Sequence, residues 1–254
     1  CQAKPHVDEH WATRFEYDST KVGQLPLPSS SEGIAERVSE LTRCAAALLR
    51  LAERDPVGTN GLLLAPERGK REFDQIRGHM VAIQEELDWA IYQRYGLIEE
   101  VTYTGDLPDL KLGERAFEIA LAQDVAAGSE STAWFGRHES TPTTAIPDVW
   151  PEGYREVVQR RLDVIESHKF IRLLEKPEFK RRWATEPWEK QVERALRGWL
   201  LDRLEDRRFW FDGSGRPAVR SVGQLADEAS RDADLVSVLE LWSGHKDQSV
   251  TASL

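Results

Sequence analysis

The stretch Ile34–Leu97 reads IAERVSELTRCAAALLRLAERDPVGTNGLLLAPERGKREFDQIRGHMVAIQEELDWAIYQRYGL, and it decides the fold. Its apolar residues recur in alternating steps of four and three, in two separate runs. The first run is Ile34, Val38, Leu41, Ala45, Leu48 and Ala52, and the second is Phe73, Ile76, Met80, Ile83, Leu87 and Ala90/Ile91. This spacing predicts two helices, over about 32–54 and 70–95, each with one apolar stripe of the coiled-coil type.

The segment between the two runs, residues 55–69, is rich in Pro, Gly and Asn and predicts a loop. Such a loop lets the second helix fold back on the first as an antiparallel hairpin. With about 20 residues in each helix, the hairpin is roughly 30 Å long, a length that suits a spacer. Gly96 follows the second run and predicts the end of that helix.

The rest of the chain predicts a mainly α protein with few short strands. We interpret residues 1–31 as the end of a preceding, target-recognition-like domain with a Pro-rich connector, residues 32–97 as the hairpin spacer and residues 98–254 as a C-terminal helical module. Within the module, Thr185 and Ser221 are predicted N-caps of helices. Val101–Tyr103 predicts a short extended piece, and Asp212–Gly215 predicts a turn.

The composition, 40% hydrophobic and 31% charged, is that of an ordinary soluble domain. No run of 18 apolar residues occurs, so we expect no membrane-spanning segment. Cys1 and Cys44 form no metal-binding or disulfide pattern, which fits a reducing cytoplasm. Because the sequence carries no initiator Met and no signal peptide, we expect it to be a segment of a longer protein.

Charge is distributed unevenly along the chain. The net charge is −10, yet residues 151–208 hold 15 Lys and Arg against 12 Asp and Glu. The candidate DNA-binding residues lie in this stretch, and they are Arg155, Arg160, Arg161, Lys180, Arg181 and Arg182. Guanidinium groups suit phosphate oxygens, and the neighbouring Trp183 can hold their stems in place. The alternative is that these cations pair with Glu178, Glu186 and Glu189 inside the module.

Catalytic motifs are missing from the sequence. A methyltransferase needs a glycine-rich turn for its cofactor and an Asn/Asp-Pro-Pro-aromatic site for the target base, and neither is present. A minor alternative is a PD-ExK-type nuclease, in which Pro147-Asp148 and Glu178-x-Lys180 would hold Mg²⁺ and activate water. The helix predicted between these two motifs disfavours a nuclease, because such sites sit on paired strands. We therefore predict no catalytic, cofactor-binding or metal-binding residue in this segment.

Two further features each have a structural and a functional interpretation. His6 and His10 are spaced to share a metal if they lie on a helix, but a polar surface turn is the interpretation we favour. Trp134, Phe135 and Trp150 would stack on bases if they were exposed, and we favour packing in the core instead.

Several longer motifs resemble known proteins. Leu25–Pro28 followed by a long helix resembles the exit of target-recognition domains in restriction–modification specificity proteins, and Glu86–Leu97 resembles the helix that follows this domain in combined restriction–methyltransferase enzymes. The segments 150–158, 180–190, 199–208 and 237–242 resemble the PglX family, the adenine-specific DNA methyltransferases of BREX phage-defence systems. This resemblance extends over nearly the whole chain.

The resemblance implies a parent enzyme that transfers a methyl group from S-adenosylmethionine to N6 of adenine in double-stranded DNA. It also implies that this segment lies after the catalytic domain and carries no catalytic residue. Two hypotheses follow for the segment itself. The first is a non-catalytic DNA-recognition and positioning segment, and the second is a docking module for other phage-defence proteins.

Overall fold

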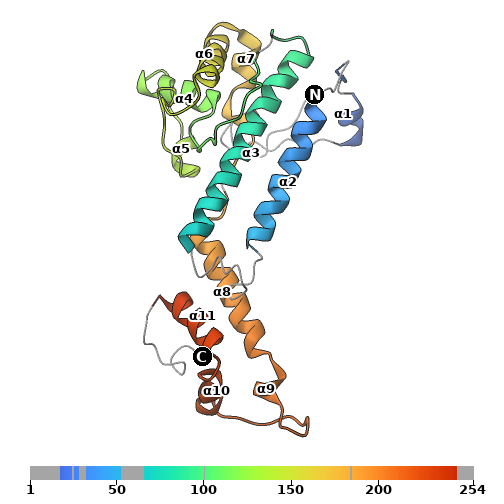
Figure 1. The fold of residues 1–254 in the computed structure, drawn as a ribbon. Coiled ribbons are helices and arrows are strands. Elements are labelled where there is room, and N and C mark those ends of the chain that lie inside the picture. The colour runs from blue at the N-terminus through green and yellow to red at the C-terminus, as the bar shows by residue number, and fades with distance from the viewer. Residues whose placement is uncertain are drawn as a thin grey trace. The chain divides into compact units, whose positions relative to one another are not determined.

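The computed structural model describes residues 18–24, 26–28, 33–52, 66–99, 101–183 and 185–244, and it is mainly helical, as predicted (Figure 1). The elements are α1 (Ser19–Gly23), α2 (Ile34–Ala52), α3 (Pro66–Arg94), α4 (Ala116–Ala126), α5 (Trp134–Arg137), α6 (Glu152–Ser167), α7 (Lys169–Leu174), the 3₁₀ turn η2 (Pro177–Phe179), α8 (Trp188–Leu204), α9 (Arg207–Trp210), α10 (Val222–Ala229) and α11 (Ala233–Ser243). In these ranges strand pairing is confined to an antiparallel bridge between Phe211 and Pro217. Val101–Tyr103, predicted as a short extended piece, lies outside the helices and forms no paired strand.

The chain divides into two compact units. The first combines the described residues of Cys1–Ala45 with Gln75–Ala184, and the second combines those of Ala46–Asp74 with Thr185–Leu254. Each unit thus joins part of the predicted hairpin to part of the predicted C-terminal module. The predicted division of function at residues 31 and 97 stays a prediction.

In the first unit, α2 and α3 lie side by side and run in opposite directions (Figure 1). His79 Nε2 on α3 lies 2.8 Å from Glu40 Oε1 on α2, and Arg37 Nη1 lies 3.9 Å from Glu86 Oε2. Residue numbers on one helix therefore fall as those on the other rise, as an antiparallel pair requires. The predicted loop between the helices lies largely outside the described residues.

The inward face of α2 differs from the predicted stripe. Val38 was expected in the stripe but is 46% exposed, whereas Leu51 is 2% exposed. An α-helix turns every 3.6 residues, so a face that contains residues 34, 41, 45 and 48 also takes in residues 37 and 51. Arg37 consequently points toward α3, and its Nη2 donates a 3.1 Å hydrogen bond to the carbonyl oxygen of Tyr103 in the segment after that helix.

The C-terminal end of α3 has the hydrogen bonds of a Schellman motif. Gly96 N donates to Gln93 O at 2.8 Å, and Leu97 N donates to Tyr92 O at 3.0 Å. Gly96 has φ = +67°, a left-handed conformation that a side chain would strain. The prediction that Gly96 ends this helix is confirmed.

The core of the first unit forms around the C-terminal half of α3. Residues from α3, α4, α6 and α7 meet in one cluster, which contains Trp89, Tyr92, Val101, Ala116, Ile165 and Ile171. Just before α4, Gly113 has φ = +98°, and a Cβ there would lie 2.2 Å from the carbonyl oxygen of Thr141. Only glycine fits this approach of two backbone segments.

The second unit packs α8 to α11 around Leu196, Leu200, Phe209, Ala226, Ala229, Leu235, Val238 and Leu239. Ser221 caps α10 through a capping box with Gln224, which confirms its predicted role. The predicted cap of α8 is wrong: the helix begins at Trp188, with Pro187 rather than Thr185 at the cap position. In the part of the chain that is described, no helix is both long and apolar enough to cross a membrane.

Candidate nucleic-acid interface

The structure separates the candidate DNA-binding cations into two groups. Arg161 is 0% exposed and Lys180 is 7% exposed, so neither side chain is available to a phosphate group. The prediction of a DNA contact is therefore wrong for these two residues. Arg160, Arg181 and Arg182 are exposed and Arg155 is half-buried, and for these four the DNA contact stays a prediction.

Arg161 lies on the core face of α6 and binds α3. Its Nη2 donates a 2.7 Å hydrogen bond to Glu86 Oε1, and its Nε donates a 3.0 Å bond to the carbonyl oxygen of Val101. Its Nη1 lies 3.9 Å from Glu85 Oε1. Burial acts to lower the pKa of Arg161, but the two glutamates outweigh it and raise the pKa. Arg161 thus places one positive charge beside two buried carboxylates, and Arg37 adds a second beside Glu86.

Lys180 holds the segment after α7 against α3. Its Nζ donates to Asp88 Oδ2 and to the Tyr92 hydroxyl, both at 3.0 Å, and to the buried carboxylate of Glu175. Tyr92 in turn donates a 2.7 Å hydrogen bond to Glu175 Oε1. Burial raises the pKa of Glu175 to about 7, because Lys180 offsets the desolvation of this carboxylate only in part.

Arg155 and Arg160 lie on the outer side of α6. Arg155 Nη1 is 3.6 Å from Asp148 Oδ1, whose side chain is fully exposed, so this contact is weak and screened by solvent. Arg160 is exposed.

Arg181 and Arg182 follow Lys180 in an extended segment, and Arg181 stacks on Trp183. The guanidinium carbon lies 4.4 Å from the Trp183 ring centroid, and Trp183 is only 4% exposed. The carbonyl oxygen of Arg181 accepts a 2.8 Å hydrogen bond from Arg115 Nη1. The side chain and the backbone of Arg181 are therefore both held in place. We expected the side-chain contact from the neighbouring position of Trp183 in the sequence.

Glu186 and Glu189, considered as partners of the candidate cations, pair with other residues. Glu186 pairs with Arg194 at 2.5 Å, and Glu189 pairs with Lys70, also at 2.5 Å. Both pairs lie in the second unit and involve none of the candidate cations.

The aromatic residues considered as base-stacking groups are buried, as we favoured. Trp134, Phe135 and Trp150 are 0%, 7% and 6% exposed. Trp134 Nε1 donates a 3.0 Å hydrogen bond to Glu118 Oε1, and Arg115 Nη2 donates a 2.8 Å bond to the same oxygen. Trp134 and Phe135 belong to the core around α4 and α5, and Trp150 packs edge-on against Tyr154 of α6.

The nuclease constellation is not assembled. Glu178 lies in the 3₁₀ turn η2 rather than on a strand, and Lys180 is engaged with Asp88 and Glu175 inside the first unit. Among the residues that the structure describes, no group of three or more His, Cys, Asp and Glu side chains is placed to hold a metal ion. His6 and His10 lie outside the described residues.

Sequence reasoning missed a set of exposed side chains on α7 and η2. Lys169, Arg172 and Lys176 are exposed, and Phe170 and Phe179 are 59% and 48% exposed. The sequence contained a signal for this exposure, because Ile171 and Leu174 lie on one face of the short helix and the flanking positions therefore face solvent.

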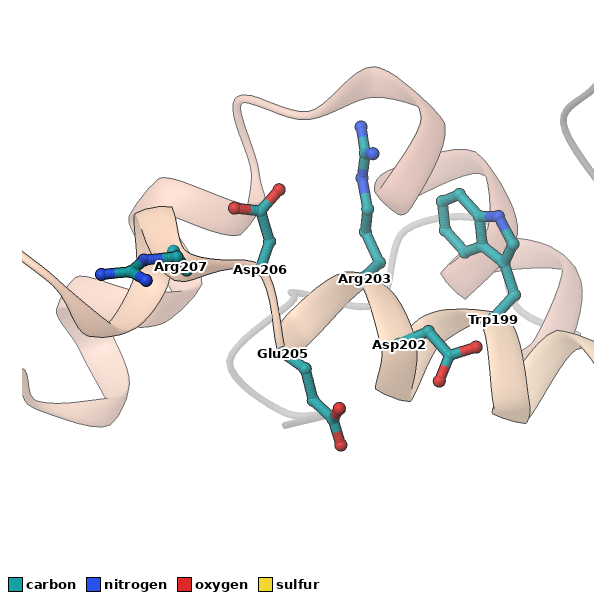
Figure 2. Close-up of a pocket in the computed structure, with 6 residues that line it drawn as sticks. All are labelled: Trp199, Asp202, Arg203, Glu205, Asp206 and Arg207. Carbon is teal, nitrogen blue, oxygen red and sulfur yellow. The ribbon is translucent and has the colours of Figure 1, made fainter.

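The second unit contains a shallow depression at the end of α8 and the start of α9 (Figure 2). Its volume is about 450 Å³, and its lining residues are Trp199, Asp202, Arg203, Glu205, Asp206 and Arg207. Figure 2 shows the charged side chains of this set projecting in several directions rather than toward one centre. Arg203 Nε is engaged with Asp232 Oδ2 at 2.9 Å. The depression therefore has no convergent group of catalytic side chains.

Comparison with known proteins finds a similar enzyme and a matching family model. It is 44% identical over 245 residues to the adenine-specific methyltransferase PglX of Streptomyces coelicolor, and the matched region covers 93% of this chain and 20% of that relative. This finding confirms the resemblance to PglX that the motifs indicated. No solved structure matches the chain. A family model described as "Domain of unknown function (DUF7008)" matches residues 80–254, and because this is more than half of the sequence, the chain belongs to that family.

Proposed function

We propose that this chain is a non-catalytic segment of an adenine-specific DNA methyltransferase and that it positions double-stranded DNA for the parent enzyme. The observation that carries the proposal is the 44% identity to PglX across 93% of the chain. The chain spans about a fifth of the length of that relative, so the methyltransferase activity is proposed for the parent and not for these residues. By the same resemblance, we propose that the parent acts in a cytoplasmic BREX phage-defence system.

S-adenosylmethionine is the methyl donor that this proposal gives to the parent enzyme. In the described parts of this chain, no strand leads into a glycine-rich turn, the arrangement that binds nucleotide-like cofactors at a helix N-terminus. These residues therefore do not fit the cofactor.

The DNA contact is proposed for the exposed cations of the first unit. Arg160, Arg181 and Arg182 reach solvent from segments whose backbone is fixed by buried ion pairs at Arg161 and Lys180. Contacts of this type bind phosphate oxygens and carry little information about base sequence. The segment would therefore set the position of DNA, and the target sequence would be read elsewhere in the parent.

The test is the salt dependence of duplex binding. Arg160, Arg181 and Arg182 are changed to Ala one at a time, and Arg43→Ala, an exposed cation on α2, serves as the matched control. Each lost phosphate contact should reduce the slope of log K against log salt by about 0.9, whereas the control should leave it unchanged. Slopes equal to that of the unmodified chain in all three variants would refute the DNA contact.

A second candidate function is docking of another protein of the same defence system. The observation in its favour is a set of exposed apolar side chains in the second unit, which are Leu201, Trp210, Val219 and Val222. Residues that contribute most of the binding energy of protein interfaces are enriched in Trp, so Trp210 would anchor such a contact. Protein docking becomes the favoured function if Arg160→Ala, Arg181→Ala and Arg182→Ala bind DNA as the unmodified chain does.

A further inference from the structure

The surface formed by α7 and η2 exposes large apolar side chains. Phe170, Leu173 and Phe179 are 59%, 49% and 48% exposed. Phe170 and Leu173 lie three residues apart on α7 and so share one face of that helix. Hydrogen bonds from Lys176 N to Leu173 O and from Phe179 N to Lys176 O form two consecutive turns that keep Phe179 close to α7. We call these three residues the apolar surface of α7–η2.

Cations surround this apolar surface. Lys169, Arg172, Lys176, Arg181 and Arg182 are exposed in residues 168–182. The carboxylates of the same segment are Glu175, which is buried, and Glu178, which is half-buried. A cluster of this sign in a chain of net charge −10 attracts a polyanion locally.

The α7–η2 segment is fixed from beneath. Glu175 and Lys180 stand at the two ends of the turn 176–179, and both side chains bind the Tyr92 hydroxyl on α3. Lys180 also binds Asp88, one turn earlier on the same helix. The exposed rings consequently lie on a prearranged platform, which lowers the entropy cost of binding a partner.

We propose that the apolar surface of α7–η2 binds unpaired bases of single-stranded DNA. Sites for single strands combine cations that follow the phosphates with aromatic rings on which bases stack, and this surface has both. In a regular duplex the base faces are covered by their neighbours, so exposed phenylalanine rings add nothing to a duplex contact. The five cations favour a nucleic acid over a protein, because an interface core between proteins is depleted of charge.

This inference rests on the proposed function and deepens it. An enzyme that modifies a base within DNA must take that base out of the stack, which leaves unpaired bases nearby. The α7–η2 surface would hold such bases, while Arg160 contacts the backbone of the flanking duplex.

The experiment measures fluorescence anisotropy of two labelled probes with the whole chain. One probe is an oligo(dT) of about 12 nucleotides, within the usual site size, and the other is a duplex of the same length. Phe170→Leu and Phe179→Leu keep apolar bulk but remove the ring. Each should weaken binding of oligo(dT) by roughly tenfold and leave binding of the duplex unchanged. Leu173→Ala shortens the member of this surface that has no ring and should weaken binding of oligo(dT) less than either Phe variant. Leu201→Ala, at an exposed leucine of α8 outside this surface, is the matched control and should leave binding of both probes unchanged.

The possible outcomes separate the two proposals. If the chain binds the duplex with the expected arginine dependence but the Phe variants leave oligo(dT) binding intact, the inference fails and the proposed function stands. Equal losses of oligo(dT) binding in the Phe variants and in Leu173→Ala would indicate a general apolar contact rather than stacking on rings, and would also overturn the inference. If neither probe binds, both proposals fail. Circular dichroism of each variant confirms that it is folded, which these exposed positions favour.

Discussion

Arg161 and Arg160 are adjacent in the sequence, and the structure gives them opposite roles. Arg161 makes two hydrogen bonds to Glu86 and Val101 from a position with no solvent exposure, whereas Arg160 is exposed on the same helix. Changing Arg161 to Ala removes the nearest cation from the buried carboxylates of Glu86 and Glu85, and leaves Glu86 with only Arg37, 3.9 Å away. Breaking a buried pair in this way costs about 3–5 kcal/mol, because an uncompensated charge stays in the interior.

A loss of that size is a large part of the free energy of unfolding of a typical domain, which is about 5–15 kcal/mol. Urea denaturation followed by circular dichroism measures it directly. Arg161→Ala should unfold at a much lower urea concentration, and Arg160→Ala should change the free energy of unfolding by less than about 0.5 kcal/mol. Glu86→Gln added to Arg161→Ala should recover part of the loss, since the amide removes the charge and still accepts the 2.8 Å hydrogen bond from Tyr103 N. Unchanged stability of Arg161→Ala, together with weaker DNA binding, would refute the structural role given to Arg161.

Three further predictions concern stability. Glu175→Gln should flatten the pH dependence of the free energy of unfolding. The folded-state pKa of Glu175, about 7, lies above the ordinary value of 4.5, so this carboxyl stabilises the fold at low pH, and up to ~3 kcal/mol is lost as the pH rises through 7. Thermal melts at pH 5 and pH 8 would detect the difference. Asp232→Asn should cost about 1–2 kcal/mol at pH 7. Burial acts to raise the pKa of Asp232, but hydrogen bonds from Arg208 and Arg203 lower it to about 2, so the difference from the unmodified chain should shrink as the pH falls from 4 toward 2. Leu51→Ala should cost about 2–4 kcal/mol and Val38→Asp less than about 0.5 kcal/mol in urea denaturation; the reverse order would mean that the observed inward face of α2 is wrong.

The sequence by itself determined the helices and the direction of the hairpin. The two runs of apolar residues indicate helices, because the helical period depends only on the spacing of neighbouring residues in the sequence. The end of α3 at Gly96 was also readable, since the left-handed conformation there is a property of one residue type. The sequence did not determine which side of α2 faces inward, because a stripe through Arg37 and a stripe through Val38 have the same period.

The tertiary structure decided which partners the buried cations have. Arg161 falls four residues after Val157 and seven after Tyr154, on the core face of α6, so the period alone could have predicted its burial. Its partner Glu86 lies 75 residues away in the sequence, and Lys180 is 92 residues from Asp88. A buried charge is tolerated only beside an opposite charge, and such a pair forms when two distant helices pack together. Local spacing carries no information about that packing, so the period places Arg161 on the inward face of α6 while only the tertiary structure provides the carboxylate that makes its burial possible.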